Sequence, residues 1–403
     1  MAKQAVKKGA GVKKNGIEAF KERRGLNYKE GDNVTITTGN AEKEMRFLIM
    51  PKAFTDAVGI HIPLNTSVLL AGHSNSGKTS IMMHLIAAAQ NGDNLCPVIF
   101  DTENNFDFSY AIACGMQAEP VYGDVEVEHV NPETAEVTIT KERKIVNYKG
   151  NFVYFNNAIL AETYGSNDYT TGKSNGKPRK VAVIEDIAYC INEMLTAQDE
   201  GEIDTGLVFL WDSIGSIGCW KSYKSSCNNA MWDAAALSVS FSGIINDRIP
   251  RGRRISSKYD NGFIATNKIW LDAMKNPMPG APPSLALKGG VSMLYGARLI
   301  VQTGKTLTSG VKRLTATSKG KNYTWGILTT LKTIKNQLSE PYSITREGEV
   351  IVTPHGLIGA DKDSIEEYKR VHMSKIIKEL QQLTGDASIT EKDVEYTEED
   401  AED

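Results

Sequence analysis

The chain has 403 residues, of which 41% are apolar and 24% are charged, and its formal net charge is −3. These values are ordinary for a soluble globular protein of one large domain or of two or three smaller ones. No apolar run reaches the roughly eighteen residues of a membrane-spanning helix, and no signal-peptide core is present. We therefore expect a cytoplasmic protein without a membrane partner. The five cysteines form no CxxC pair, which argues against a structural zinc site.

The two ends of the chain carry opposite charges. Residues 1–30 contain nine Lys or Arg against three Glu, whereas residues 391–403 contain eight acids and one Lys. We expect a basic N-terminal arm over residues 1–33 and a mobile acidic tail over residues 388–403. Such segments either only keep a protein soluble or modulate its binding to a polyanion.

Five short apolar runs lack the alternation of half-buried strands. They cover residues 66–71, 97–101, 207–212, 262–267 and 297–302. Runs of this kind predict strands that are buried on both faces of a largely parallel sheet. Helical patterns lie between them, over residues 80–90, 180–198 and 232–249. The alternation predicts an α/β fold in which helices flank a central sheet.

Two stretches interrupt this pattern. Residues 120–150 contain two alternating runs separated by NPETA, which predicts a β-hairpin, and residues 163–179 are rich in Gly, Ser and Asn, which predicts a surface loop. A small C-terminal region over residues 346–387 should contain a helix at 364–383. Ser364 would be its N-cap and Glu367 the capping-box partner.

Residues 72–79 read GHSNSGKT and fit the pattern G-x-x-x-x-G-K-[ST] between a predicted strand and a predicted helix. In this pattern the glycines let backbone N–H groups turn toward phosphate oxygens, and the start of the helix adds its positive dipole end. A lysine reaches the outer phosphates and a Ser or Thr hydroxyl binds Mg²⁺. The sequence therefore predicts a nucleoside triphosphate site with contacts from Gly72, His73, Ser74, Asn75, Ser76, Gly77, Lys78, Thr79 and Ser80, of which Thr79 is also a metal ligand.

Two acids follow apolar runs. Asp212 ends the run LVFLWD, where a carboxylate at the carboxyl edge of a sheet would face the magnesium ion, although an Asp in this place is often only a turn former. Glu103 follows the run PVIFD and would lie beside the γ-phosphate. A carboxylate there can orient and deprotonate an attacking water. These motifs alone leave open a kinase, in which a substrate hydroxyl replaces the water.

The series FDTENNFDFSYAIACG resembles a segment of the RecA family in which the catalytic Glu is followed at fixed offsets by an Asp, a Tyr and a Gly. Here these are Glu103, Asp107, Tyr110 and Gly115. The later segments LVFLWDSIG, GFIATNKIW, KGGVSMLYGARLIVQ and LKTIKNQLSEPY resemble further motifs of that family in the same order. The resemblance spans about residues 34–345. It implies a RecA-type P-loop NTPase core with ATP and Mg²⁺ as cofactors.

Roles for several side chains follow from the resemblance. It implies that Tyr110 stacks on adenine and that Asp107 contacts the base, although a tyrosine that only packs beneath its helix would look the same. It also implies that Asn267 lies near the nucleotide and that Lys268 senses the γ-phosphate. Lys335 would be a catalytic residue that reaches the ATP of a neighbouring subunit. Lys78 would be a catalytic residue that contacts the ATP of its own subunit.

The sequence departs from the family pattern at two positions. Lys268 stands where the family usually has Gln or His, so a point charge replaces an amide. Gln337 stands where the family has the second of two lysines. The group of lysines that reaches a neighbouring subunit's ATP therefore contains Lys335 alone, or Lys332 takes the second place. The hairpin and the Gly-rich insert have no family counterpart.

The resemblance places two DNA-binding loops, one after Asp212 and one over residues 269–290, the second of which should be irregular and mobile. Lysines would neutralise phosphates there, while aromatic or apolar side chains stack on bases, although any single lysine is more often a solvated surface charge. The predicted contacts are Lys221, Tyr223, Lys224, Trp270, Lys275, Met278, Lys288, Gly289 and Gly290. A third basic patch, with Arg251, Arg253 and Arg254, would either bind incoming duplex DNA or only close a loop.

The function implied is that of an ATP-dependent recombinase, which polymerises into a filament on single-stranded DNA and pairs it with homologous duplex DNA. Single-strand-binding or mediator proteins would be further partners. The divergence fits a viral relative of the bacterial and T-even phage (UvsX-type) recombinases, in the cytoplasm of an infected bacterium. Alternatives are a hexameric helicase with the same fold and a DNA-binding scaffold with weak ATPase activity. A small-molecule kinase fits least well.

Overall fold

The computed structural model describes residues 42–130, 137–174, 178–227, 229–272, 284–287, 290–305 and 310–400. The predicted basic arm at residues 1–33 lies outside these ranges. The strands are β1 (Phe47–Leu48), β2 (Ile62–Pro63), β3 (Ser67–Gly72), β4 (Leu95–Asp101), β5 (Glu119–Val130), β6 (Val137–Lys149), β7 (Val153–Asn156), β8 (Asn167–Asp168), β9 (Lys173–Ser174), β10 (Gly206–Asp212), β11 (Gly262–Asp272), β12 (Ser284–Leu287), β13 (Leu299–Thr303), β14 (Lys312–Ser318), β15 (Lys321–Asn336), β16 (Glu347–Thr353), β17 (Gly356–Gly359) and β18 (Glu395–Asp400).

The α-helices are α2 (Lys52–Val58), α3 (Lys78–Gln90), α4 (Phe108–Ala113), α5 (Asn157–Tyr164), α6 (Ile184–Asp199), α7 (Trp220–Lys224), α8 (Ala230–Gly243), α9 (Gly290–Gly296) and α10 (Lys362–Thr384). The helix predicted at 232–249 ends earlier, because α8 passes into a π-helical turn, Ile244–Arg248, and a 3₁₀ turn, Pro250–Arg253. No helix of the described residues has both the length and the apolar character needed to cross a membrane.

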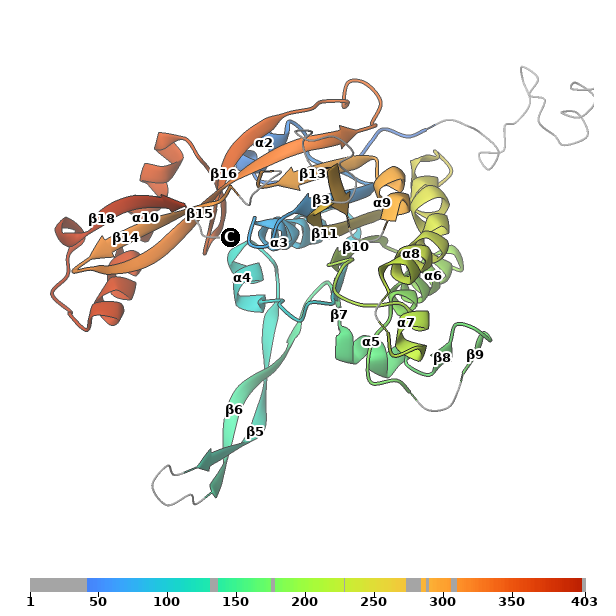
Figure 1. The fold of residues 1–403 in the computed structure, drawn as a ribbon, viewed down its shortest axis with the longest axis horizontal. Coiled ribbons are helices and arrows are strands. Elements are labelled where there is room, and N and C mark those ends of the chain that lie inside the picture. Colours follow the sequence, from blue (N-terminus) through green and yellow to red (C-terminus); the bar gives the residue numbers. More distant parts are fainter. Residues whose placement is uncertain are drawn as a thin grey trace, which may run out of the picture.

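A mixed sheet organises the fold (Figure 1). Within the described residues it has twelve strands, nine of them in the order β17-β16-β15-β13-β3-β11-β10-β4-β7. The central strands, from β13 through β3, β11, β10 and β4 to β7, are parallel, whereas β15, β16 and β17 continue the sheet with antiparallel pairs. All five predicted buried strands are present, and the predicted α/β class is confirmed.

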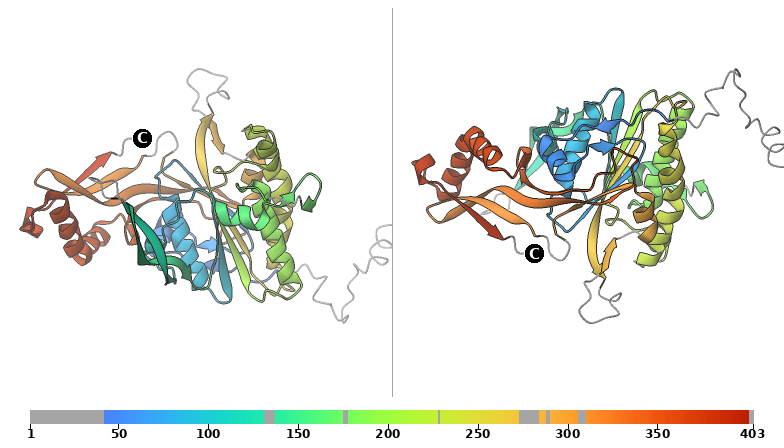
Figure 2. Two further views of the ribbon diagram at one scale, coloured as in Figure 1. Left: turned by 90° about the horizontal axis from the view of Figure 1, so that it is seen from below. Right: turned by 90° about the horizontal axis from the view of Figure 1, so that it is seen from above.

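Burial on both faces explains why these strands lack an alternating pattern. Successive side chains of a strand point to opposite faces of the sheet. In β3, Val68 and Leu70 belong to one core cluster and Leu69 and Ala71 to the other, and all four are at most 1% exposed. The second cluster lies between the sheet and the helices α6 and α8, on the side opposite α3 (Figure 2).

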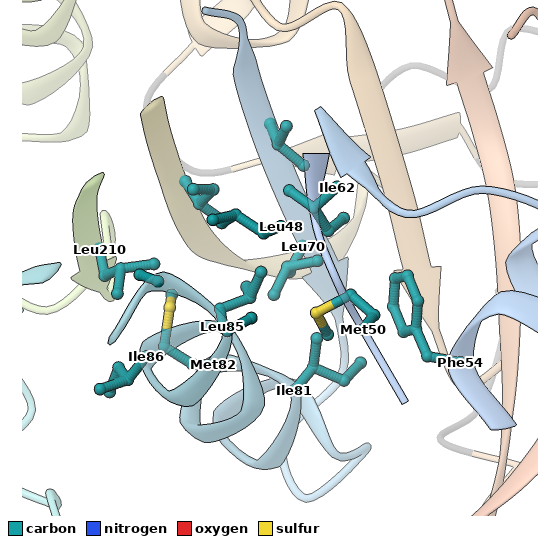
Figure 3. Close-up of a cluster of buried hydrophobic side chains, with 14 of the residues drawn as sticks. Leu48, Met50, Phe54, Ile62, Leu70, Ile81, Met82, Leu85, Ile86 and Leu210 are labelled. Atoms are coloured by element: carbon teal, nitrogen blue, oxygen red, sulfur yellow. The ribbon is translucent and has the colours of Figure 1, made fainter. Parts of the chain in front are cut away.

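The first cluster fixes helix α3, which follows the GHSNSGKT segment. Ile81 and Leu85 of α3 lie against Leu70 of β3, and Met82 lies beside Leu210 of β10 (Figure 3). The helix is apolar on most sides and is correspondingly buried. Replacing one such leucine by alanine typically costs about 2–5 kcal/mol of stability. The packing therefore holds the first turn of α3 firmly at the edge of the sheet.

The predicted hairpin at 120–150 is confirmed and forms an arm. Strands β5 and β6 pair along their whole length and project away from the sheet (Figure 1). Cross-strand pairs such as Asp124 with Arg143 and Glu126 with Lys141 carry opposite charges, which stabilises the ribbon. Its base is held where the ring of Tyr148 stacks on Phe108 of α4, with 4.3 Å between the ring centroids.

The C-terminal part of the chain extends the sheet instead of following it. Helix α10 packs on β14, β15 and β16 around Trp325, Ile351 and Leu380, so the boundary expected near residue 345 falls within one packed unit. The helix begins earlier than predicted, because the side chain of Asp361 rather than Ser364 accepts the N-cap hydrogen bond. The prediction of a mobile acidic tail is wrong for residues 395–400, which form β18 and pair antiparallel with β14.

A histidine side chain joins helix α3 to the hairpin of β16 and β17. Nε2 of His84 on α3 accepts a hydrogen bond of 2.9 Å from the backbone N–H of Leu357 on β17. A Cβ at the preceding Gly356 would lie 2.7 Å from the imidazole ring, and this glycine has a positive φ of 109°. Burial lowers the pKa of His84 to about 4.

We expect this histidine to make stability depend on pH. Since its folded-state pKa lies below the ordinary value of 6.5, the unfolded chain binds the proton first. The contribution of neutral His84 is complete above about pH 6.5 and is lost as the pH falls toward 4. Between pH 7 and pH 4 the wild type should lose up to about 3 kcal/mol more unfolding free energy than His84→Gln, whose amide oxygen can accept the same bond. Urea unfolding at each pH measures the difference, and identical pH dependence in the two proteins would contradict it.

Candidate nucleotide and nucleic-acid site

The parallel register brings several polar residues to one edge of the sheet. Asp212 at the end of β10 is paired with Asp101 at the end of β4. On the other side, Lys268 of β11 and Thr303 of β13 both lie opposite Gly72, where β3 ends. The segment that fits the phosphate-binding pattern and the two predicted acids therefore share the carboxyl edge, which is the usual ligand side of a parallel sheet.

The segment from Gly72 to Lys78 turns sharply into α3. Gly77, directly before the helix, has a φ of 94°, which only glycine adopts readily. The Lys78 ammonium donates to the carbonyl oxygens of Gly72 at 3.0 Å and of His73 at 2.5 Å. Burial lowers the pKa of Lys78 to about 8, against the opposing effects of Asp212 and Glu103. A partly desolvated ammonium at a helix start is favourable for an anionic ligand.

Other predicted contacts of this segment differ in exposure. Ser74 and Asn75 are exposed at its tip, and Asn75 adopts a positive φ of 57°. Ser76 is fully buried, and its hydroxyl lies 2.6 Å from the hydroxyl of Thr303. Ser80 is buried on the first turn of α3.

Asp212 connects three elements of the site. Its Oδ2 accepts a hydrogen bond of 2.9 Å from the Thr79 hydroxyl, and its Oδ1 accepts one from the Thr266 hydroxyl of β11. Burial raises the pKa of Asp212, while these two hydrogen bonds lower it. Oxygen donors of this kind are what Mg²⁺ prefers, so Thr79 and Asp212 fit the predicted metal role. Among the described residues, no cluster of three His, Cys, Asp or Glu side chains offers another metal site.

Glu103 lies beside Thr79 and Asp212. Its Oε1 accepts a hydrogen bond of 2.5 Å from the Ser213 hydroxyl and lies 3.4 Å from the Lys268 ammonium. Burial raises the pKa of the carboxyl, but the Ser213 bond and the Lys268 charge outweigh it, and the net pKa is below the usual range. The side chain is 21% exposed and stays ionised at neutral pH. Its position suits a base that accepts a proton from water.

The two residues predicted to recognise the base have structural partners within the chain. Asp107 is the N-cap of α4 and accepts hydrogen bonds from the backbone N–H groups of Ser109 and Tyr110. The Tyr110 ring packs against the first core cluster, its hydroxyl is buried, and burial raises its pKa. These contacts agree with the packing interpretation of the tyrosine, and the predicted contacts with adenine stay predictions.

Two further predicted residues are placed as follows. Asn267 is fully buried on β11, opposite Ala71 of β3. The Lys335 ammonium donates to the carbonyl oxygens of Leu294 and Tyr295 at the end of α9, at 2.9 and 3.0 Å. Lys335 is thus bound to its own chain, and its role across a subunit boundary stays a prediction.

Thr266 and Thr303 also contact the site, although no motif in the sequence marks them. Each of them lies at or near the end of a buried run, as Asp212 does, which is the signal that identifies the edge of the sheet. Ser76, which was predicted, is held from both sides, since Thr329 of β15 also donates to its carbonyl oxygen at 3.1 Å.

The first predicted DNA segment forms the short helix α7. Tyr223 is 42% exposed, and Lys221 and Lys224 are exposed on the same helix. The Lys221 ammonium lies 4.4 Å from the ring centroid of Trp232, and that of Lys224 lies 5.1 Å from the ring centroid of Trp220. The three predicted DNA contacts are therefore together, on an ordered element.

The prediction of an irregular second segment over residues 269–290 is wrong at both ends. Residues 269–272 continue β11, and residues 284–287 form β12, which pairs with it antiparallel. The reason is that IWLD and SLAL are mainly apolar and contain no Pro or Gly, and the prolines lie in the stretch between them. Trp270 belongs to β11 and Gly290 begins α9. Lys275, Met278, Lys288 and Gly289 lie outside the described residues.

The third basic patch lies at the opposite edge of the sheet. Arg253 is half-buried and donates to the carbonyl oxygen of Asn65, which precedes β3, and burial lowers its pKa. Arg251 forms an ion pair of 2.5 Å with Asp247, and Arg254 forms a backbone bridge with Glu42. Since these contacts are at the amino edge of β3, the patch is separate from the nucleotide site. Its predicted duplex binding stays a prediction.

Comparison with known proteins gives limited matches. A 113-residue segment is 29% identical to the protein RecA of Roseiflexus castenholzii and covers 26% of this chain and 32% of that protein. A 98-residue segment is 32% identical to the protein RecA of Chloroflexus aurantiacus and covers 23% of this chain and 28% of that protein. No family model matches the chain. The matches thus span about a third of these relatives at most, and they support a distant RecA-like relationship.

The close approach of Gly72 to β13 predicts that the site does not tolerate a side chain there. A Cβ at Gly72 would lie 2.1 Å from the Thr303 hydroxyl and 2.4 Å from its carbonyl oxygen. Gly72→Ala should therefore displace the segment and weaken the binding of an ATP analogue by about tenfold or more, a loss of about 1.4 kcal/mol. Titration calorimetry measures the affinity. Gly243→Ala on α8 is the matched control, since no atom lies within 4 Å of its Cβ position, and equal affinities in both variants would contradict the prediction.

Proposed function

We propose that this protein is an ATP-dependent DNA recombinase with a RecA-type P-loop core. It would polymerise on single-stranded DNA and pair that strand with homologous duplex DNA. The observation that carries the proposal is the arrangement of Glu103 beside Lys78, Thr79 and Asp212 at one edge of the sheet. The distant similarity to bacterial RecA proteins supports the choice of this function among those that use a triphosphate site.

In the proposed reaction, Lys78 and the N–H groups that follow Gly72 bind the triphosphate. Thr79 and Asp212 would hold Mg²⁺, and the bound ion would supply positive charge beside the phosphate oxygens. Glu103 accepts a proton from the water that attacks the γ-phosphorus, and ADP and phosphate are released. ATP binding would favour the DNA-binding assembly and hydrolysis would favour its release, a population shift driven by the difference in nucleotide affinity.

In this proposal Lys268 links the nucleotide to Glu103, the catalytic base. Its ammonium is paired with Glu103, and its backbone lies opposite Gly72, so it is within reach of both the base and the phosphate-binding segment. A γ-phosphate would compete with Glu103 for this cation. Binding of ATP would then free the Glu103 carboxylate to act on water. Lys268 would do this in place of the amide of the family pattern.

The remaining roles complete the proposal. Tyr110 and Asp107 would contact the adenine after a local rearrangement, and Lys335 would exchange its carbonyl partners for the ATP of a neighbouring subunit. Lys221, Tyr223 and Lys224 of α7 would contact single-stranded DNA, as would the segment between β11 and β12. A cytoplasmic location, a viral origin and assistance by single-strand-binding or mediator proteins stay predictions.

The decisive experiment measures ATP hydrolysis with and without single-stranded DNA. We expect DNA to stimulate the wild type strongly, and Glu103→Gln to lose at least about a hundredfold in turnover while it still binds DNA in the presence of ATP. Glu119→Gln is the matched control, because it removes a carboxylate on the exposed hairpin, where Glu119 pairs with Lys149. Hydrolysis that ignores DNA, with DNA binding that ignores nucleotide, would contradict the recombinase. Electron microscopy of the same samples separates a filament from the closed ring of a helicase.

Removal of the Lys268 charge should change the pH dependence of turnover. Lys268 lowers the pKa of Glu103, so this pKa should rise in Lys268→Met. Because the base works when ionised and is paired with Lys268 before ATP binds, the acidic limb of the kcat/KM profile, which reports the free enzyme, should move toward higher pH. Steady-state ATPase rates between pH 5 and 8 give the profile. Lys319→Met removes a lysine that pairs with Asp386 instead and should leave the limb in place; a Lys268→Met profile that coincides with that of the wild type would contradict the coupling.

A further inference from the structure

The Gly-rich insert at 163–179 is folded against the body of the protein rather than being only a surface loop. Asp168 and Arg179, which both belong to it, are each only 6% exposed. The carboxylate of Asp168 accepts hydrogen bonds from the backbone N–H groups of Thr170 and Thr171 and so fixes a turn. The described residues of the insert, 163–174 and 178–179, therefore have a defined structure in which Asp168 and Arg179 are directed inward.

A buried ion pair joins this insert to helix α6. The Arg179 guanidinium lies 2.5 Å from the carboxylate of Asp186, and their side chains are 4% and 0% exposed. Asp186 also accepts hydrogen bonds from the Tyr169 hydroxyl at 2.7 Å and from the backbone N–H of Val183 at 2.8 Å. An ion pair at this depth is tolerated only when further hydrogen bonds satisfy it, as they do for this carboxylate.

The arginine is also in contact with aromatic rings. Its guanidinium carbon lies 4.9 Å from the ring centroid of Trp220 and 5.7 Å from that of Tyr169. Within the described part of the chain, Nε and Nη1 of Arg179 have no hydrogen-bond partner. Their compensation comes from the two ring faces, and the planar guanidinium is suited to this contact. Arg179 thus fixes the position of Trp220, the first residue of α7.

Further contacts hold α7 at both ends. The Trp220 indole N–H donates to the Thr170 hydroxyl at 2.9 Å, and its backbone N–H donates to Glu185 of α6 at 2.8 Å. At the other end, the Lys224 ammonium lies 3.7 Å from the carboxylate of Asp168. Thr170 and Asp168 belong to the insert. A helix of five residues is too short to be stable by itself, so contacts of this kind determine whether it forms.

We propose that the insert at 163–179 is a support for the DNA-binding surface, and that Arg179 is a positioning residue that acts on DNA through Trp220. By holding Trp220, it keeps Lys221, Tyr223 and Lys224 on one ordered helix facing single-stranded DNA. This inference rests on the proposed function, because it assumes that α7 contacts DNA. Arg179 itself touches neither nucleotide nor DNA.

Two variants test this support without removing the fold around it. Arg179→Lys keeps a cation for Asp186 but lacks the planar group that stacks on Trp220. Thr170→Val removes the acceptor of the indole hydrogen bond and leaves the ion pair intact. Arg143→Lys is the matched control, because Arg143 also lies over a tyrosine, Tyr122 at 5.6 Å, but on the exposed hairpin.

The measurement is the binding of a fluorescent oligothymidylate by anisotropy, in the presence of a non-hydrolysable ATP analogue. Each variant of the support should weaken binding by about fivefold to tenfold, whereas Arg143→Lys should not. DNA-free ATPase activity should be unchanged in all of them. Combined with Lys221→Ala and Lys224→Ala, the Arg179→Lys change should add little further loss, since residues acting through one another are not additive.

The possible results separate the support from the recombinase itself. One result is DNA binding that is lost in the α7 lysine variants but unchanged in Arg179→Lys and Thr170→Val. This result would overturn the support and leave the recombinase standing. Losses that add fully to those of the lysine variants would show that Arg179 acts independently of Lys221 and Lys224, which also overturns the positioning role. A wild type that binds no single-stranded DNA would overturn both.

Discussion

The site depends on the hydrogen bonds of one partly buried carboxylate. Asp212 accepts from Thr79 on α3 and from Thr266 on β11, so three elements that are distant in sequence meet at its two oxygen atoms. A carboxylate in this environment is costly unless its acceptor sites are filled, and two hydroxyl groups fill them. The same hydrogen bonds align the start of α3 with the ends of β10 and β11. The segment from Gly72 to Lys78, Glu103 and Lys268 therefore occupy fixed positions relative to one another.

The two inserts use different physical means to remain ordered. The hairpin of β5 and β6 is stabilised by cross-strand charges in water and joins the body through the stacked rings of Tyr148 and Phe108. The insert at 163–179 instead buries an ion pair, Arg179 with Asp186, in which each charge has partners of its own. The second insert contacts α7 through Thr170 and Asp168. A buried charge must keep its hydrogen-bond partners. It therefore holds an insert in place more strictly than a charge on a solvated hairpin does.

Much of this architecture was predictable from sequence because buried parallel strands leave a simple signal. Continuous apolar runs located β3, β4, β10, β11 and β13, and the residues following them marked the carboxyl edge, including Glu103 and Asp212. Other features depend on partners that lie far away in sequence. Nothing near Arg179 indicates that it meets Asp186 and Trp220, and nothing near Lys335 indicates that the end of α9 binds it. The ordering of the acidic segment in β18 likewise depends on a free edge at β14.

That last pairing has a consequence for how the C-terminus can be altered. Lys312 of β14 pairs with Glu398 of β18 at 2.6 Å, and the backbones of the two strands form a continuous ladder. Truncation before residue 395 would remove negative charge and, at the same time, expose the N–H and C=O groups of β14 as a new sheet edge. Such edges recruit strands from other molecules, whereas the acidic side chains of β18, the outer strand on this side of the described sheet, disfavour that pairing, so a shortened protein would self-associate more readily. Amide substitutions within β18 would change the charge while leaving the edge covered.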